Sequence, residues 1–155
     1  MLHDEMLKAA KALVPVRGKP SQAKLRRATS TIYYAIFHAI AQNSADMLVG
    51  ISKTARSERA WLQVYRALEH GFAKSQCANP KIMSLFPQEV QDFATKFVAL
   101  QSKRHDADYN PAASFKKSEV MREIDETELV LKAFSNSASK DKRAFAVYVM
   151  MKTRP

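Results

Sequence analysis

The segment that decides the fold is residues 22–49, which read QAKLRRATSTIYYAIFHAIAQNSADMLV. It contains no proline or glycine, so a helix of ~40 Å, rising 1.5 Å per residue, can run through it without a break. Ser21, immediately before it, is a typical N-cap residue. The apolar residues extend most of the way round this helix: Leu25, Ile32, Tyr33, Ala35, Ile36, Phe37, Ala39 and Ile40. A helix that is apolar on more than one face is normally central, so we expect other helices to pack around it.

Apolar residues at helical spacing predict further helices on either side of this segment. They cover about residues 2–14, 57–68 with a pattern that fades up to residue 77, 87–109, 116–134 and 144–151. Ser57 is expected to cap the second of these helices, and Pro87 to lie in the first turn of the third. The last segment is apolar and β-branched, so a strand is the alternative to the helix that we favour. Residues 135–139 have the composition of a flexible spacer.

These patterns predict an all-α protein. With only 3 glycines in 155 residues, the chain is unlike a sheet protein rich in tight turns. We expect an up-and-down helical bundle of four to five main helices over residues 1–136. Residues 137–155 are expected to form a C-terminal extension, packed on the bundle or at an interface. The broadly apolar helix and the apolar tail also predict a homodimer.

The length and composition favour one soluble intracellular domain. Cys77 is the only cysteine, which excludes a disulfide within one chain and fits a reducing cytoplasm. Asp4 and Glu5 lie near the N-terminus, where no signal-type apolar run occurs. No segment is long and apolar enough to cross a bilayer, so we expect a cytoplasmic protein without a membrane partner.

The charge is strongly basic, at a formal +10. Basic residues gather in residues 17–27 and 140–154, whereas residues 119–128 are mostly acidic. This balance favours a polyanionic partner, either nucleic acid or an acidic protein. The alternative is a solubilising surface, because charge alone carries no specificity for a reaction.

Arg104 is the clearest single candidate for a functional residue. It follows Phe97 by seven positions and so shares the apolar face of its helix. Because a guanidinium keeps its charge, a half-buried arginine at such a position needs an anionic partner. Asp108, four residues later, can be that partner, and a phosphate of RNA or of a nucleotide can be another.

Two segments together resemble the HEPN domain family, the higher eukaryote and prokaryote nucleotide-binding domains. The first is residues 27–39, where Arg27 precedes Tyr-Tyr-Ala and Phe-His. The second is residues 104–111, with an arginine, Ala-Asp-Tyr and Asn-Pro. The similarity extends over residues 2–134. It implies a helical bundle, usually a homodimer, that binds or cleaves RNA or nucleotides, often as a metal-independent endoribonuclease of toxin–antitoxin, CRISPR or other defence systems.

The chain departs from the family pattern at one important position. The family's active element is an arginine followed, after four to six residues, by a histidine, and both subunits contribute it across the dimer cleft. Arg104 matches the arginine, but Tyr109 occupies the position five residues later and no histidine follows it. Acid–base cleavage of RNA normally needs a group that titrates near neutrality. A tyrosine, with an ordinary pKa near ~10, is a poor base, although it can donate a hydrogen bond or stack on a nucleobase.

Seven residues are therefore candidates for the site. The catalytic candidates are Arg104, His105 and His38, and the nucleotide- or RNA-binding candidates are Arg27, Tyr34, Asp108 and Tyr109. Each has an ordinary structural alternative: an exposed helix-end residue for His105, a hydrogen-bonded buried histidine for His38, a core aromatic for Tyr34 and a solvated basic face for Arg27. His70 is expected to be an ordinary helix-end residue. No histidine pair has metal-ligand spacing, so we expect neither a metal nor a cofactor.

Three functions follow as hypotheses. In the first, the protein is a ribonuclease in which Arg104 stabilises the phosphorane-like transition state and His105 or His38 replaces the missing base. In the second, it is a non-catalytic module that binds a nucleotide, a nucleic acid or a protein. In the third, which the family resemblance implies, it is the partner of a nucleotidyltransferase or antitoxin that modifies Tyr109.

Overall fold

The computed structural model describes residues Met1–Pro155 and consists of eight helices without a strand. The helices are α1 (Leu2–Leu13), α2 (Gln22–Leu48), α3 (Glu58–Ala67), α4 (His70–Cys77), α5 (Pro80–Met83), α6 (Gln88–Tyr109), α7 (Lys117–Ser135) and α8 (Ser139–Met150). The predicted all-α fold class is therefore confirmed. None of these helices combines the length and the hydropathy that crossing a membrane requires.

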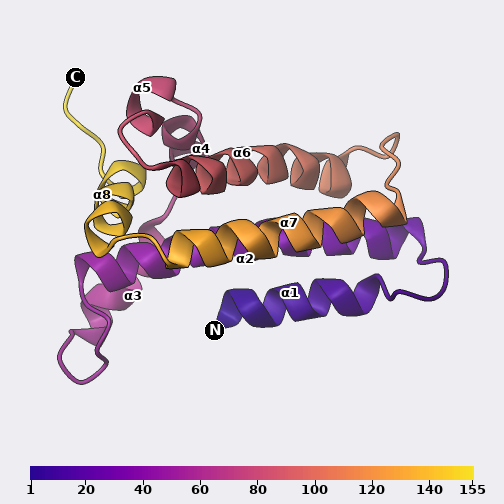
Figure 1. The fold of residues 1–155 in the computed structure, drawn as a ribbon, viewed down its shortest axis with the longest axis horizontal. Helices are drawn as coiled ribbons and strands as arrows, with labels where there is room; N and C mark the ends of the chain where they lie inside the picture. The colour runs from indigo at the N-terminus through magenta and orange to yellow at the C-terminus, as the bar shows by residue number, and fades with distance from the viewer.

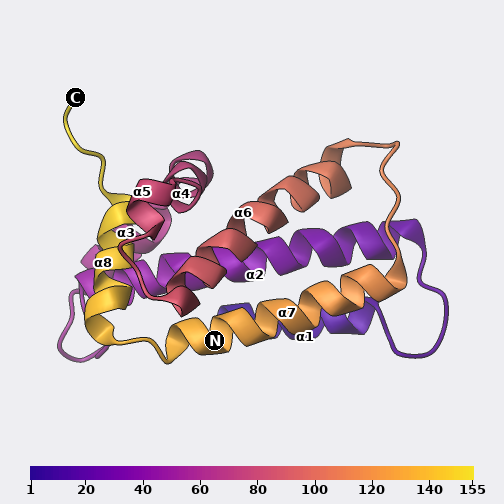
Figure 2. The ribbon, with the colours of Figure 1, turned by 45° about the horizontal axis from the view of Figure 1, so that its top comes forward.

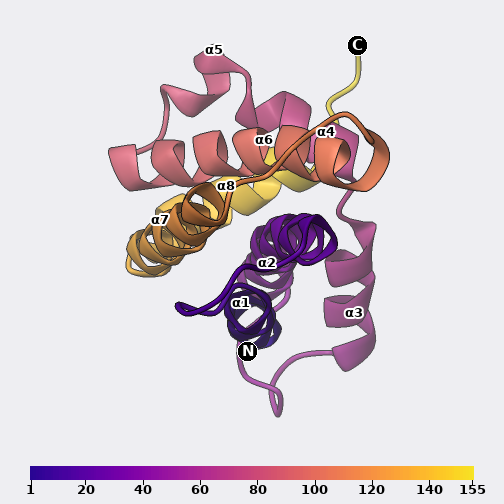
Figure 3. The ribbon, with the colours of Figure 1, turned by 90° about the vertical axis from the view of Figure 1, so that its right-hand side faces the viewer.

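The central element is α2, as its broad apolar surface predicted. It packs against α1, α3, α6, α7 and α8, and it buries more residues than any other helix. Figure 3, which looks along the length of α2, shows α1, α3, α6 and α7 arranged around it. In Figure 1, α1 and α7 extend alongside α2, whereas Figure 2 shows that α6 crosses it obliquely. Five of the other helices are thus positioned by contact with α2, whereas α4 and α5 pack against α6.

The C-terminal segment is a helix, α8, and it belongs to the same core. Its Phe145 is fully buried and lies edge-on to Phe86, Phe93 and Phe134. Phe145 and Val149 join the cluster of 28 buried apolar residues that includes the centre of α2. Burial of one large apolar side chain stabilises a fold by about 1.5–3 kcal/mol, so α8 adds materially to stability. Residues 136–138 are the short connection before it, and Ser137 within them is buried.

The N-caps of two helices agree with the prediction from the sequence, but one break between helices does not. Ser21 and Ser57 each accept a hydrogen bond from the backbone N–H three residues later, at 3.2 Å. The fading helix expected up to Cys77 is in fact two helices, because the backbone at Leu68 is extended. Leu68 is buried although no residue of α3 is, and neither it nor its immediate neighbours is a glycine or a proline. Pro87 is the N-cap of α6 rather than a residue of its first turn.

Arg26 of α2 caps the far end of α6. Its guanidinium donates hydrogen bonds to the carbonyl oxygens of Ala107 at 3.0 Å and Asn110 at 2.9 Å, and also to that of Ala113 in the following loop. The last carbonyls of a helix have no partner within the helix and carry its negative dipole, which a cation complements. Gln22, one turn earlier, bonds the backbone of Phe115 in both directions. The start of α2 therefore holds the end of α6 and the loop behind it.

Replacing Arg26 is expected to destabilise the fold, whereas replacing its neighbour Arg27 is not. Hydrogen bonds from a charged group are worth about 1.5–3 kcal/mol, so Arg26→Ala should lower the free energy of unfolding by about 2 kcal/mol. Arg27 is exposed and makes no ion pair, so Arg27→Ala should change it by less than about 0.5 kcal/mol. Urea unfolding of both variants measures the difference, and equal losses would contradict the capping role.

Candidate functional site

Arg104 lies in the last third of α6, against two aromatic rings of α2. Its side chain is only 14% exposed. The centre of the guanidinium is 5.0 Å from the ring centroid of Tyr33 and 5.8 Å from that of Tyr34. Both distances allow cation–π attraction. The apolar face of α6 thus continues into a cation that rests on aromatic rings.

The carboxylate of Asp108 satisfies this cation only in part. Its Oδ2 lies 3.7 Å from a terminal nitrogen of Arg104 and accepts a hydrogen bond of 3.4 Å from the Ser30 hydroxyl. The Nε atom of Arg104 is buried and has no hydrogen-bond partner. A buried donor of a charged group that lacks a partner is costly. Because Nε has no access to solvent, an anion from outside the chain can meet only the terminal nitrogens, whose one ion pair within the chain is 3.7 Å long.

A polar cavity of about 390 Å³ lies next to Arg104. No apolar side chain lines it; its walls are Lys74 of α4 and Gln101, Ser102, Arg104, His105 and Asp106 of α6. The side-chain oxygen of Gln101 is buried there without a partner. The charged groups of its wall are two cations and one carboxylate, and no apolar side chain adjoins them. Such a wall suits a small, hydrated, negatively charged group such as phosphate.

His70, the first residue of α4, packs against Tyr33, Tyr34 and Phe37 of α2 and forms with them an aromatic corner beside Arg104. Its Nδ1 and the Tyr33 hydroxyl share a hydrogen bond, and its ring stacks on Phe37 with centroids 3.9 Å apart. Burial lowers the pKa of His70, and the positive charge of Arg104 lowers it further. Burial likewise raises the pKa of Tyr33, an effect that Arg104 offsets only in part.

The expectation that His70 is merely a helix-end residue is incomplete, because the residue also belongs to this corner. The contact with Tyr33 joins residues 37 positions apart. No sequence pattern links them; only the corner at Leu68 turns α4 back toward α2.

The other histidine candidates lie in different surroundings. His38 is hydrogen-bonded through Nδ1 to the hydroxyl of Tyr65 in α3 at 2.7 Å and stacks on that ring. Burial lowers the pKa of His38, with a smaller effect of His3. These contacts turn His38 toward α3 rather than toward Arg104. His105, in contrast, is exposed and lines the polar cavity beside Arg104.

The binding candidates divide in the same way. Tyr34 and Asp108 both contact Arg104. Tyr109 is 67% exposed at the end of α6, with its ring 5.2 Å from that of His105. Arg27 is exposed on α2, seven residues before Tyr34 and so on nearly the same face of the helix. Tyr34 and Asp108 therefore lie at Arg104, and Tyr109 lies beside His105 at the end of α6. Arg27 lies two helical turns before Tyr34 on α2.

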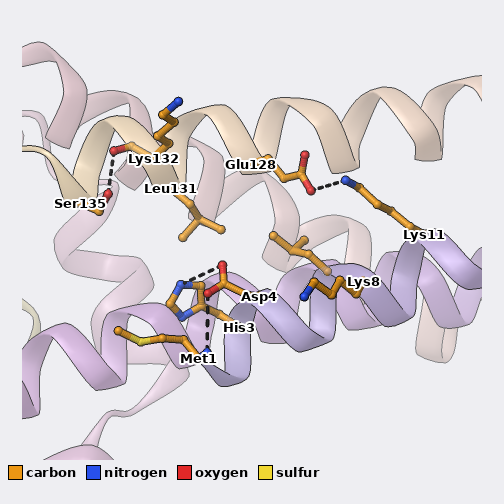
Figure 4. Close-up of a pocket in the computed structure, with 10 residues that line it drawn as sticks. Met1, His3, Asp4, Lys8, Lys11, Glu128, Leu131, Lys132 and Ser135 are labelled. Carbon is orange, nitrogen blue, oxygen red and sulfur yellow. Dashed lines mark hydrogen bonds and ion pairs between the residues drawn. The ribbon is translucent and has the colours of Figure 1, made fainter.

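A larger cavity, of about 520 Å³, lies between α1 and α7 (Figure 4). Two of its cations are paired: Lys11 lies 2.5 Å from Glu128, and the N-terminal ammonium lies 3.7 Å from Asp4. Lys8 and Lys132 also line this cavity and make no ion pair. None of the seven candidate residues lies in it. No group of three or more His, Cys, Asp or Glu side chains is arranged to hold a metal ion.

The lowered pKa values of His38 and His70 predict a loss of stability in mild acid. Below the ordinary histidine pKa near 6.5, the unfolded chain takes up protons that the folded chain resists. The free energy of unfolding should therefore fall as the pH drops from 6.5 through the lower folded values. The double variant His38→Gln/His70→Gln should show a smaller fall in urea titrations at pH 7.5 and 5.5. An equal fall in the variant and the wild type would show that these histidines are not responsible.

Comparisons with known proteins add no family or relative. The chain matches no protein-family model, no curated protein and no solved structure. The chemistry of the site is therefore argued from its residues and their geometry.

Proposed function

We propose that the recess at Arg104 binds phosphate groups of RNA or of a nucleotide. The observation that carries this proposal is the half-buried guanidinium, whose terminal nitrogens make one ion pair of 3.7 Å, beside a cavity lined by polar residues alone. The planar fork of an arginine matches phosphate oxygens, two at a time. Lys74 provides a second cation in the same cavity.

The surroundings of the recess fit a nucleic acid better than an isolated phosphate. Tyr34 is half-buried beside Arg104, and Tyr109 is largely exposed one turn beyond it. Stacking of a nucleobase on an aromatic ring contributes about 1–3 kcal/mol per base. The formal charge of +10 adds a long-range attraction for a polyanion.

The resemblance of residues 27–39 and 104–111 to HEPN domains supports the same proposal. The proposal includes two structural features of that family: α2 and the helices around it form one up-and-down bundle, and two copies of the chain form a homodimer. Because the expected histidine of the family motif is replaced by Tyr109, a binding module is favoured over an enzyme. The binding module is thus the first candidate function.

A metal-independent endoribonuclease is the second candidate. His105 favours it, because an exposed imidazole lines the same cavity as Arg104. An imidazole titrates near neutrality and can move the proton of a ribose 2′-hydroxyl, while Arg104 stabilises the charge of the transition state. His38 is less suited, since its Nδ1 already bonds Tyr65.

A partner protein of the nucleotidyltransferase or antitoxin type is part of the same proposal. The phenol of Tyr109 is accessible at the end of α6, as covalent nucleotide transfer to its oxygen requires. Such a modification would add negative charge beside Arg104 and compete with RNA for it.

Arg104→Ala should weaken RNA binding at least tenfold, because it removes the fork that holds phosphate. Arg104→Lys, which keeps the charge and loses the fork, should recover only part of the affinity. Arg122→Ala is the matched control, since Arg122 is an exposed arginine of α7 whose only ion pair, with Glu126, is 3.8 Å long. Fluorescence anisotropy with a labelled single-stranded RNA measures all four proteins. A folded Arg104→Ala protein that binds like the wild type would refute the proposal and make Arg104 a structural residue.

Cleavage of a mixed RNA pool in the presence of EDTA separates the two candidate functions. For a binding module, wild-type protein should leave the RNA intact at concentrations that saturate binding. Cleavage that disappears in both Arg104→Ala and His105→Ala would establish the ribonuclease instead.

A further inference from the structure

His70 contacts the same two tyrosine rings as Arg104, although it is not among the residues that line the polar cavity. Its ring is held on three sides: Phe37 stacks on it, Tyr34 meets it edge-on and the Tyr33 hydroxyl bonds Nδ1. Nε2 has no partner within the protein and is not among its buried polar atoms that lack one. The open edge of the ring is therefore the one that carries Nε2.

Arg104 and Tyr33 together decide which ring nitrogen of His70 carries the proton. Arg104 lies against the same two tyrosine rings as His70, and its charge disfavours a second cation there. A neutral imidazole has a single N–H. Nδ1 of His70 is the one hydrogen-bond partner of the Tyr33 hydroxyl within the chain, so we infer that the phenol donates its proton there and Nδ1 accepts it. The proton of His70 is then on Nε2, at the open edge.

We propose that His70 donates its Nε2–H to a phosphate oxygen held by Arg104, and that the site selects an internal phosphodiester over a terminal phosphate. The charged groups around this corner are Lys74, Arg104, Asp106 and Asp108, which sum to zero. His70 adds a donor without adding a charge. In surroundings without net charge, removing the single charge of a phosphodiester from water costs less than removing the double charge of a terminal phosphate. This inference rests on the proposed function, since it names the substrate class of the same recess.

Nitrogen-15 NMR of the histidines tests the tautomer without any ligand. In the wild-type protein at pH 7.5, Nε2 of His70 should carry the proton and Nδ1 should not. A protonated Nδ1 would overturn the inference, because Nε2 would then have no hydrogen to donate.

Binding tests the donor. The probe is a labelled oligouridylate without terminal phosphates, and uridine 5′-monophosphate is the competitor. His70→Ala should weaken binding of the oligonucleotide about tenfold. His70→Gln, whose amide nitrogen takes nearly the place of Nε2, should stay within about threefold of the wild type. His3→Ala removes a histidine from α1, away from this corner, and is the control.

The outcomes separate this inference from the function on which it rests. If Arg104→Ala weakens binding and His70→Ala does not, the phosphate site stands and the role of His70 is refuted. If uridine monophosphate competes as strongly per phosphate as the oligonucleotide, the selection for a phosphodiester is refuted. Absence of oligonucleotide binding by the wild type would overturn both proposals. Should His70→Ala fail to fold, the NMR result and His70→Gln still decide the question.

Discussion

The burial of α2 on several sides is the constraint on which the rest of the structure depends. Its residues Ile32, Tyr33, Ile36 and Ile40 are completely inaccessible to water. Each layer of neighbouring helices removes a different face of α2 from solvent, so a helix that was apolar on one face alone could not organise them. The single continuous core then follows, because α1, α6, α7 and α8 all place apolar residues against this helix or one another.

The same constraint explains how a guanidinium comes to lie at the edge of a core. Tyr33 is fully buried and stacks on Phe97 of α6. It also faces Arg104, which lies two turns further along the same face of α6. The aromatic ring is thus shared between packing and the charged site. Because the site is built on two long helices rather than on loops, its side chains are held by the packing that holds the fold. Arg26 reinforces this arrangement by fixing the end of α6 on which Asp108 and Tyr109 lie.

Much of the fold could be predicted because helix formation here is governed by local patterns. The long unbroken α2, the caps Ser21 and Ser57, and the helical C-terminal tail were all indicated by residue type and spacing. The corner at Leu68 could not be predicted, since neither Leu68 nor its immediate neighbours is a glycine or a proline. The capping role of Arg26 could not be predicted for a related reason: the adjacent residues Arg26 and Arg27 differ by about 100° in direction, and only the packing shows which of them meets the end of α6.

For the site, helical periodicity is enough to predict that Arg104 shares a face with Phe97 and that Asp108 lies within its reach. The sequence by itself also determined the basic charge that favours a polyanionic partner. Only the tertiary structure decided that His38 faces Tyr65, that His70 joins Tyr33 and that Lys74 shares a cavity with Arg104. Those contacts join residues on different helices, and their geometry depends on how the helices cross, which the periodicity of a single helix does not contain.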